Sequence, residues 1–252
     1  MSGTVLILGG TAEARALAAA LADRGECVVS SLAGRVSEPA LPAGTVRIGG
    51  FGGPEGLRTW LSDNDCRAVV DATHPFARRI SENAAGAARS AGLPLVRLQR
   101  PAWSPEPGDR WIDVDDMDAA AAVVADRGER VFLTTGRQDV GVFAGIDHVW
   151  FLIRVVDPPE SALPRQHLVL RSRGPYHLPG EQALLRDHRI DLLVTKNSGG
   201  EYTRPKLRAA AQAGVRVVMV RRPEPVTDGE QVTSVGAVLA WLARLPGRPV
   251  RG

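Results

Sequence analysis

The chain has 252 residues, of which 44% are hydrophobic and 23% charged, values typical of a globular protein with a substantial core. Its formal net charge is only +3 and it has no stripe of basic and aromatic residues, so we expect no nucleic-acid binding. No apolar run approaches the ~20 residues of a membrane span, and the chain begins without a basic leader. We therefore expect a cytoplasmic enzyme without a metal site, in which Cys27 and Cys66 are free thiols.

Apolar runs alternate with helical patterns along the chain, which is typical of βαβ units and parallel sheets. The predicted strands are Thr4–Leu8, Cys27–Ser31, Val46–Ile48, Ala68–Asp71, Leu95–Leu98, Val131–Thr134, Val149–Val155, Leu168–Arg171, Leu192–Thr195 and Val215–Val220. The predicted helices are Glu13–Arg24, Pro54–Asp63, Phe76–Ala91, Met117–Asp126, Gly180–His188, Arg204–Ala213 and Gly236–Leu245.

The pattern repeats within the chain. Pro101 corresponds to Pro223, 122 positions later, and both follow similar helix–strand segments. The strand and turn Val5–Gly10 correspond in the same way to Val131–Gly136, 126 positions later. We therefore predict an α/β protein of two Rossmann-like parallel-sheet domains that arose by internal duplication.

The loop-forming run WSPEPGDRW ends the first half of the chain. We accordingly place a first, dinucleotide-binding domain at residues 1–128 and a second, substrate-binding domain at residues 129–252. Ligands of parallel sheets lie beyond the carboxyl ends of the strands. The turns that follow the strands are therefore expected to line one active-site cleft between the two domains.

The first turn contains Gly9, Gly10 and Thr11, with Glu13 in the first turn of the next helix. Glycines let a pyrophosphate approach the backbone, and a helix N-terminus offers free N–H groups and a positive dipole. We predict that these four residues bind a dinucleotide. The pattern GGTAEA departs from G-x-G-x-x-G, so a tight turn without a ligand is the alternative.

The second strand ends at Ser31, and Arg35 follows shortly after it. NAD enzymes usually have an acidic residue near this point, which holds the ribose 2′-hydroxyl. Here hydroxyls and an arginine stand in its place, which favours NADPH over NADH. The alternative is that Arg35 is a surface residue after a glycine turn.

The fourth strand leads into the turn Asp71–Ala77, in which Pro75 favours a helix start. His74 then lies at the strand end, where a nicotinamide would bind. We predict that His74 contacts cofactor or substrate, and a purely structural histidine is the alternative.

The strand ends of the second half are rich in cations, hydroxyls and amides, which suit a ligand with several carboxylates. Solvent-exposed loops are the alternative for any one of these turns. The predicted substrate-binding residues are Arg137, Arg173, Tyr176, Lys196, Asn197 and Ser198.

Tyr202 and Lys206 have the Tyr-x-x-x-Lys spacing of short-chain dehydrogenases. Pro205 interrupts the spacing, and the first turn lacks the glycine pattern of that family. We interpret the spacing as coincidental, and an oxidoreductase that uses this pair is the alternative.

The motifs GGTAEAR, SLAGR, VDATHPFA, RGPY and TKNSGG occur in an order and spacing that resemble the precorrin-6A reductase family over about Val5 to Leu245. The resemblance implies two Rossmann-like domains and NADPH-dependent reduction of one macrocycle double bond of precorrin-6A, giving precorrin-6B in cobalamin biosynthesis. A sister enzyme reduces the cobalt-containing substrate, and these residues do not separate the two. The resemblance also suggests transfer of product to neighbouring enzymes of the pathway.

Hydride transfer from a nicotinamide depends mainly on alignment in a cleft that excludes water. The proton that completes the reduction can come from His74, from Tyr176 or from water. Two other functions share the architecture, namely a nucleotide- or tetrapyrrole-binding module without catalysis and a two-domain glycosyltransferase.

Overall fold

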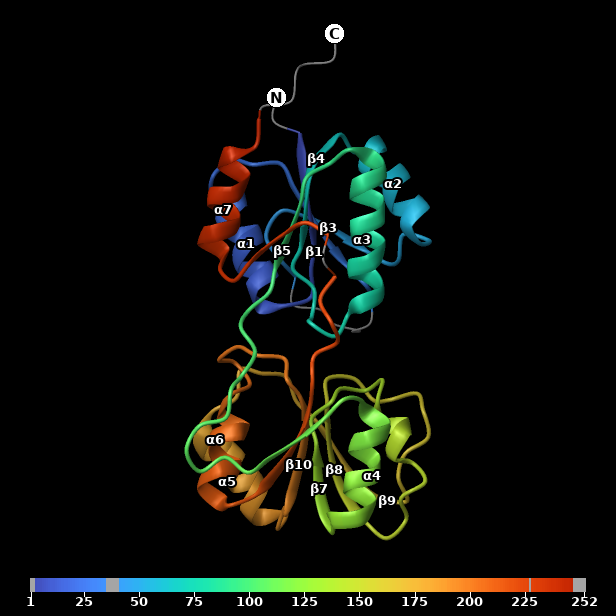
Figure 1. Ribbon diagram of the computed structural model, residues 1–252, viewed down its shortest axis with the longest axis vertical. Helices are drawn as coiled ribbons and strands as arrows, with labels where there is room; N and C mark the ends of the chain where they lie inside the picture. The colour runs from blue at the N-terminus through green and yellow to red at the C-terminus, as the bar shows by residue number, and fades with distance from the viewer. Residues whose placement is uncertain (1–2, 35–40, 227, 247–252) are drawn as a thin grey trace. The chain divides into compact units, whose positions relative to one another are not determined.

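The computed structural model describes residues 3–34, 41–226 and 228–246 (Figure 1). The chain forms two compact units, and each is built around its own parallel sheet. Unit 1 comprises Met1–Arg100 and Glu224–Gly252, whereas unit 2 comprises Pro101–Pro223.

Unit 1 contains a six-stranded sheet in the order β12-β5-β4-β1-β2-β3, with every pair parallel. Its strands are β1 (Thr4–Leu8), β2 (Val28–Leu32), β3 (Thr45–Ile48), β4 (Cys66–Asp71), β5 (Leu95–Leu98) and β12 (Glu230–Val232). Its helices are α1 (Ala12–Ala22), α2 (Pro54–Asp63), α3 (Arg78–Ala91) and α7 (Val235–Arg244). The strand order is that of dinucleotide-binding sheets.

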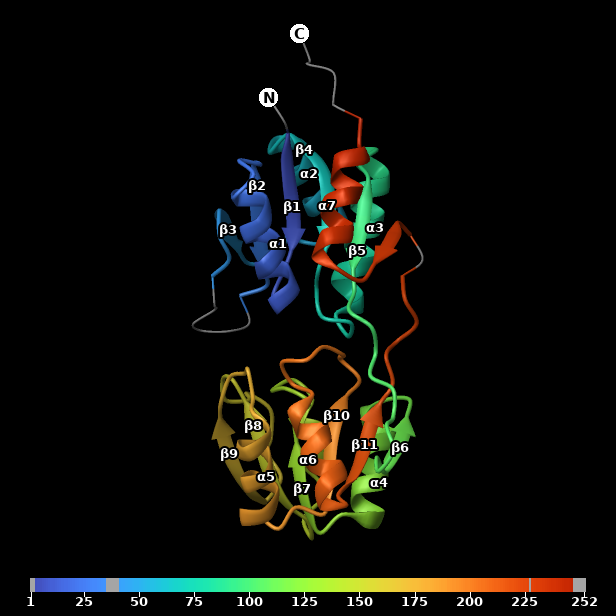
Figure 2. The ribbon, with the colours of Figure 1, turned by 90° about the vertical axis from the view of Figure 1, so that its left-hand side faces the viewer.

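Helices cover both faces of this sheet, which explains why the central strands are almost entirely apolar (Figures 1 and 2). Val5 and Ile7 point to the face that α1 and α7 cover, where they pack with Trp241. Leu6 and Leu8 point to the opposite face and pack against α2 and α3. The alternation of strand side chains thus divides one apolar run between two cores.

Unit 2 repeats this architecture, in the order β6-β11-β10-β7-β8-β9 with every pair parallel. Its strands are β6 (Trp111–Val114), β7 (Arg130–Leu133), β8 (Trp150–Val155), β9 (Gln166–Arg171), β10 (Leu192–Lys196) and β11 (Arg216–Val220). Its helices are α4 (Met117–Arg127), α5 (Leu178–Asp187), α6 (Pro205–Ala213) and the 3-10 helix η1 (Val140–Phe143). The matching strand orders support the predicted duplication.

The division of the chain differs from the predicted boundary between residues 128 and 129. Strand β6 and helix α4 belong to unit 2, because β6 pairs with β11. Strand β12 and helix α7 belong to unit 1, because β12 pairs with β5. The chain therefore passes between the units twice, at Pro101 and at Pro223, the two prolines that correspond in the repeat.

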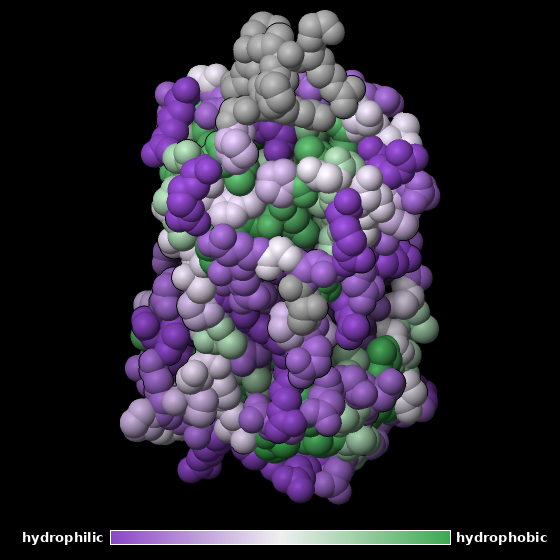
Figure 3. All heavy atoms as spheres, turned by 45° about the horizontal axis from the view of Figure 1, so that its top comes forward, coloured by the Kyte–Doolittle hydropathy of each residue, from purple (hydrophilic) through white to green (hydrophobic). Residues whose placement is uncertain are grey.

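No helix in the described ranges is long and apolar enough to cross a membrane. Figure 3 shows hydrophilic side chains over most of the face that it displays, with hydrophobic side chains confined to smaller areas. The large apolar side chains are mainly in the cores of the two units.

The exchanged segments make the division testable with fragments. We expect residues 101–223 to fold alone with a cooperative thermal transition, because this fragment contains all six strands of its sheet. A fragment of residues 129–252 lacks β6 and α4 of unit 2. It also contains β12 and α7, which pair with and pack on the sheet of unit 1 that this fragment lacks, so it should not fold cooperatively. Circular dichroism of both fragments during heating measures the difference, and the reverse result would restore the boundary at 128/129.

Candidate functional site

The turn after β1 has the geometry of an anion-binding turn. Gly10 has a φ of +109°, and a side chain there would meet nothing within 4 Å, so the backbone is open to a ligand. Thr11 is the N-cap of α1, where its hydroxyl accepts from the Ala14 N–H at 3.1 Å and donates to the Ala72 carbonyl at 2.8 Å. The N–H groups of Ala12 and Glu13 also precede the first internal hydrogen bond of α1, which Arg15 donates to Thr11, and such N–H groups can bind an anion.

A buried carboxylate orders the turn after β4, the neighbour of β1. Asp71 accepts from the backbone N–H of Thr73 at 3.1 Å and from its hydroxyl at 2.6 Å. The other carboxylate oxygen lies 3.6 Å from Nε of Arg97 on β5, and both side chains are buried. Asp71 was not among the predicted site residues, although an acid at the end of an apolar strand is the signal that could have identified it.

His74 is half-buried in this turn, three residues beyond the last residue of β4, at the strand end predicted for it. Its Nδ1 accepts from the backbone N–H of Phe76 at 3.3 Å, and the two rings lie 5.7 Å apart. An acceptor Nδ1 implies a neutral imidazole with its proton on Nε2. The structure thus favours His74 Nε2 as a hydrogen-bond donor.

Glu13 forms an ion pair with Arg100, which follows β5, at a distance of 2.7 Å. Both side chains are mostly buried, so the arginine offsets the negative charge beside the predicted pyrophosphate site. Glu13 therefore positions the strand-end turns of unit 1, and a direct contact between its carboxylate and the cofactor remains a prediction.

Ser31 lies at the end of β2, next to a residue that the sequence analysis missed. Arg47 on β3 is in register with Ser31, and its Nη1 lies 3.4 Å from the serine hydroxyl. Burial lowers the pKa of the Arg47 guanidinium, although arginine remains charged in proteins. The predicted cofactor residue Arg35 lies outside the described residues.

In unit 2, two of the predicted substrate cations have partners within the protein. Lys196 Nζ lies 2.5 Å from a carboxylate oxygen of Asp139, and both side chains are about one-fifth exposed. Arg137 Nη1 lies 3.5 Å from Glu160, whose side chain is almost fully exposed, so this pair is weak. An ammonium has three donor hydrogens, so the ion pair with Asp139 does not by itself exclude a contact between Lys196 and a ligand.

The predicted substrate residue Asn197 has a different role in the structure. Its side chain accepts from the Trp103 N–H at 2.8 Å and donates to the Trp103 carbonyl at 3.0 Å. Its backbone carbonyl accepts from Nε of Arg222 at 2.8 Å. Asn197 therefore fastens together the two segments at which the chain enters and leaves unit 2.

Gly199 in the same turn reinforces this clamp. It has a φ of +67°, and a Cβ there would lie 2.1 Å from the Pro101 carbonyl oxygen, so no side chain fits. Arg222 also donates to this carbonyl at 3.2 Å. Ser198, between Asn197 and Gly199, is buried and its N–H donates to the Lys196 carbonyl at 2.7 Å.

Tyr176 is held by a buried ion pair that the sequence analysis missed. Arg154 Nη1 lies 2.5 Å from Glu181, and its guanidinium lies 3.7 Å from the centre of the Tyr176 ring. The Tyr176 hydroxyl donates to the Ser172 carbonyl at 3.1 Å. The ring packs against Arg154 of β8 and the hydroxyl bonds within the turn, which favours a positioning role over proton donation. Arg173 in the same turn is exposed.

The Tyr202–Lys206 pair is not assembled as in a short-chain dehydrogenase. Tyr202 lies in the loop before α6 and is 57% exposed. Lys206 is on α6, is buried, and has its ammonium 5.5 Å from the centre of the Trp103 ring. This geometry argues against the alternative oxidoreductase.

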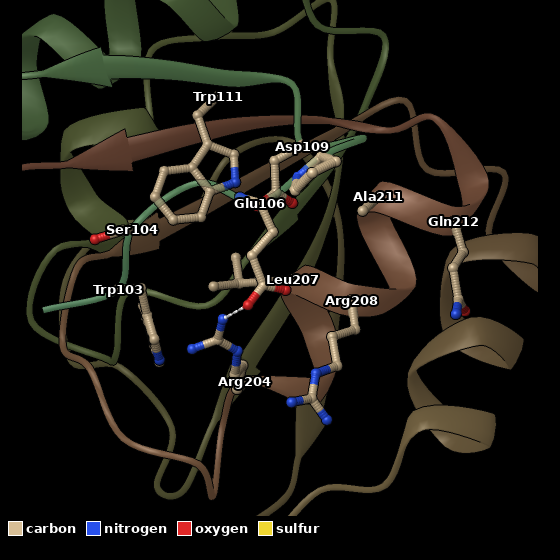
Figure 4. Close-up of a pocket in the computed structure, with 11 residues that line it drawn as sticks. Trp103, Ser104, Glu106, Asp109, Trp111, Arg204, Leu207, Arg208, Ala211 and Gln212 are labelled. Carbon is tan, nitrogen blue, oxygen red and sulfur yellow. Dashed lines mark hydrogen bonds and ion pairs between the residues drawn. The ribbon is translucent and has the colours of Figure 1, made fainter.

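A cavity of about 280 Å³ lies in unit 2 between the segment 103–111 and α6 (Figure 4). Glu106 and Arg204 form an ion pair at its side, and Trp103 and Trp111 line it. It contains none of the predicted substrate residues, so it is not the candidate site.

In the part of the chain that the structure describes, the two units differ around the turn after the central strand β1 or β7, although Gly136 of unit 2 keeps a positive φ of +89° like Gly10. In unit 2 the residues that correspond to Gly9 and Thr11 are Thr135 and Arg137. The long helix α1 is replaced by η1, which has four residues. The buried hydroxyl of Thr135 has no hydrogen-bond partner among the described residues. The duplication has thus kept the sheet and changed the chemistry of its strand ends.

The chain is similar to known proteins over almost its whole length. A family model described as Precorrin-6x reductase CbiJ/CobK matches residues 4–243. A precorrin-6A reductase of Rhodococcus erythropolis is 54% identical over 97% of this chain and 99% of that protein. A cobalt-precorrin-6A reductase of Salmonella typhimurium is 30% identical over 96% of this chain and 97% of that protein. A solved structure named CobK precorrin-6A reductase is 39% identical, with a TM-score of 0.91, and covers 98% of this chain and 100% of that chain.

The role of Asn197 can be tested by replacing it with alanine. We expect a loss of about 1–3 kcal/mol in the free energy of unfolding, because the substitution leaves the buried polar groups of Trp103 without partners. Gln182→Ala, which removes an exposed amide–amide contact in the same unit, should change it by less than about 0.5 kcal/mol. Chemical denaturation measures both. Unchanged stability with a raised KM for the substrate would return Asn197 to substrate binding.

Proposed function

Because the chain belongs to the precorrin-6x reductase family, we propose that it catalyses the NADPH-dependent reduction of precorrin-6A to precorrin-6B in cobalamin biosynthesis. The observation that carries the proposal is the family match over residues 4–243, which includes the strand-end turns of both units. The 54% identity to a precorrin-6A reductase extends over almost the whole of both chains.

The same comparison favours the metal-free substrate. The relative that acts on the cobalt-containing compound is 30% identical, against 54% for the relative that acts on precorrin-6A. Both cover nearly the whole chain, so the difference in identity does not come from a difference in matched length.

The residues of unit 1 fit a phosphorylated dinucleotide. The open backbone at Gly10 and the N-terminus of α1 suit a pyrophosphate. The end of β2 carries Ser31, and residues 32–34 that follow contain no acid that would repel a 2′-phosphate. These features support NADPH as the cofactor.

A bound nicotinamide supplies a hydride, and the chain has to orient it, exclude water and provide a proton. We assign the proton or a directing hydrogen bond to His74 Nε2, because Nδ1 is occupied by the Phe76 N–H. Asp71 fixes the turn that carries His74 through its two bonds to Thr73.

Lys196 and Arg173 at the strand ends of unit 2 are assigned to the acetate and propionate carboxylates of the substrate. Cationic groups lower the cost of moving carboxylates out of water. Tyr176 positions the turn that carries Arg173, through its contacts with Arg154 and Ser172. Arg137 and Ser198 remain predicted contributors to the same pocket.

The activity itself is tested by anaerobic incubation of the enzyme with NADPH and precorrin-6A. The absorbance of the macrocycle and that of the nicotinamide should change together, one NADPH for each macrocycle, and cobalt-precorrin-6A should react more slowly. Binding without any absorbance change would indicate a non-catalytic module, and faster reduction of the cobalt compound would reverse the substrate assignment.

Substitution of His74 separates chemistry from local structure. His74→Asn keeps an acceptor near the position of Nδ1 for the Phe76 N–H but removes Nε2, so we expect kcat to fall by about 10-fold or more with little change in melting temperature. His74→Ala removes both ring nitrogens, so both kcat and the melting temperature should fall. His148→Asn, at an exposed histidine, is the matched control. Wild-type kcat in His74→Asn would show that His74 only braces the turn.

A further inference from the structure

Three neighbouring strands of unit 1 end in a row of polar groups. Gly9 at the end of β1 donates its N–H to the Ser31 carbonyl at 2.9 Å, and Ser31 on β2 is in register with Arg47 on β3. Adjacent strands lie ~5 Å apart. In dinucleotide-binding sheets the adenosine ribose lies near the end of the second strand, here β2. Arg47 lies on the neighbouring strand β3, about one strand spacing away.

The guanidinium of Arg47 is held in a fixed orientation. Nη1 donates to the Gly49 carbonyl at 2.6 Å, and Nη2 donates to the Gly50 carbonyl at 2.6 Å. The plane of the group lies over the ring of Phe51, 3.7 Å from its centre. The long, flexible side chain is thus ordered before any ligand binds, which reduces the entropy lost on binding.

These contacts leave one edge of the guanidinium available. Within the described part of the chain, Gly49, Gly50 and Ser31 account for the hydrogen bonds of Arg47. Nε–H and the second hydrogen of Nη2 point along the same edge, and this edge can bind two oxygens of a phosphate at once. Its positive charge is only partly screened, because the group is half-buried.

We infer that Arg47, assisted by the Ser31 hydroxyl, binds the 2′-phosphate of the cofactor and makes the enzyme select NADPH over NADH. The inference rests on the proposed function, since it requires that unit 1 binds a nicotinamide dinucleotide. The selecting cation is then Arg47 on β3, whereas the sequence pattern predicted it at Arg35, directly after β2. Arg47 is a binding residue in this account and takes no part in the chemical step.

The test compares Arg47→Met with wild type in the binding of NADPH and NADH, followed by nicotinamide fluorescence. Loss of a charge-assisted pair of hydrogen bonds should raise the Kd of NADPH by about 10- to 100-fold and leave the Kd of NADH within about twofold. Arg58→Met removes an exposed arginine of α2 and should change neither value. Calorimetry with 2′,5′-ADP and 5′-ADP should reproduce the difference without the nicotinamide.

A second variant is needed because Arg47→Met could also disturb the loop that contains Gly49 and Gly50. Ser31→Ala is a small change, and it should raise the Kd of NADPH by about 3- to 10-fold without affecting NADH. Equal losses for both dinucleotides, or no loss for either, in Arg47→Met and Ser31→Ala would overturn the inference while leaving the reductase proposal intact. Failure of the wild-type enzyme to bind either dinucleotide would instead overturn the cofactor assignment, and the inference with it.

Discussion

Parallel pairing of every strand is the constraint on which the rest of the molecule depends. A parallel neighbour can be reached only by a return path across the face of the sheet, so helices cover both faces and the strands must be apolar on both sides. All carboxyl ends then lie along one edge of each sheet. The turns at that edge are free to carry polar residues, because the core does not include them. This edge therefore carries the residues of the candidate site. Gly10 and His74 lie in turns after β1 and β4, and Arg47 and Lys196 lie at the ends of β3 and β10.

The duplicated sheets show how one architecture acquires two chemistries. Unit 1 kept the glycine turn and the N-terminus of α1, which suit a pyrophosphate. Unit 2 keeps a glycine of positive φ, Gly136, but flanks it with Thr135 and Arg137 and follows it with a short 3-10 helix. It has Lys196 at the end of β10, paired with Asp139 just before η1. The core positions tolerate little change, whereas the strand-end turns can change without affecting the packing of either sheet.

Much of this could be predicted from the sequence, and the exceptions have physical causes. The long apolar strands and the helices were predicted to within about two residues, because their periodicity is strong. Strands β6 and β12 were missed since they are short edge strands of mixed composition, WIDV and EQV. Without them the domain boundary was misplaced. Arg47 and Arg154 were missed because a charged residue inside a strand gives no signal until its neighbours are known. Asn197 was predicted to bind the substrate because the sequence alone does not show that both polar atoms of the Asn197 side chain form hydrogen bonds with the backbone of Trp103.

The exchange of β6 and β12 between the two units affects the order in which they can fold while the chain is being translated. Unit 2 is continuous in the chain, so all six of its strands are synthesised before β12 and α7 of unit 1. Unit 1 must wait, because Val238, Trp241 and Leu242 of α7 complete the core that Leu17 and Leu21 of α1 begin. Until α7 is made, only α1 covers that face of the sheet, and β5 lacks its neighbour β12, so the nascent unit 1 exposes apolar surface and an unpaired strand edge of the kind that favours aggregation.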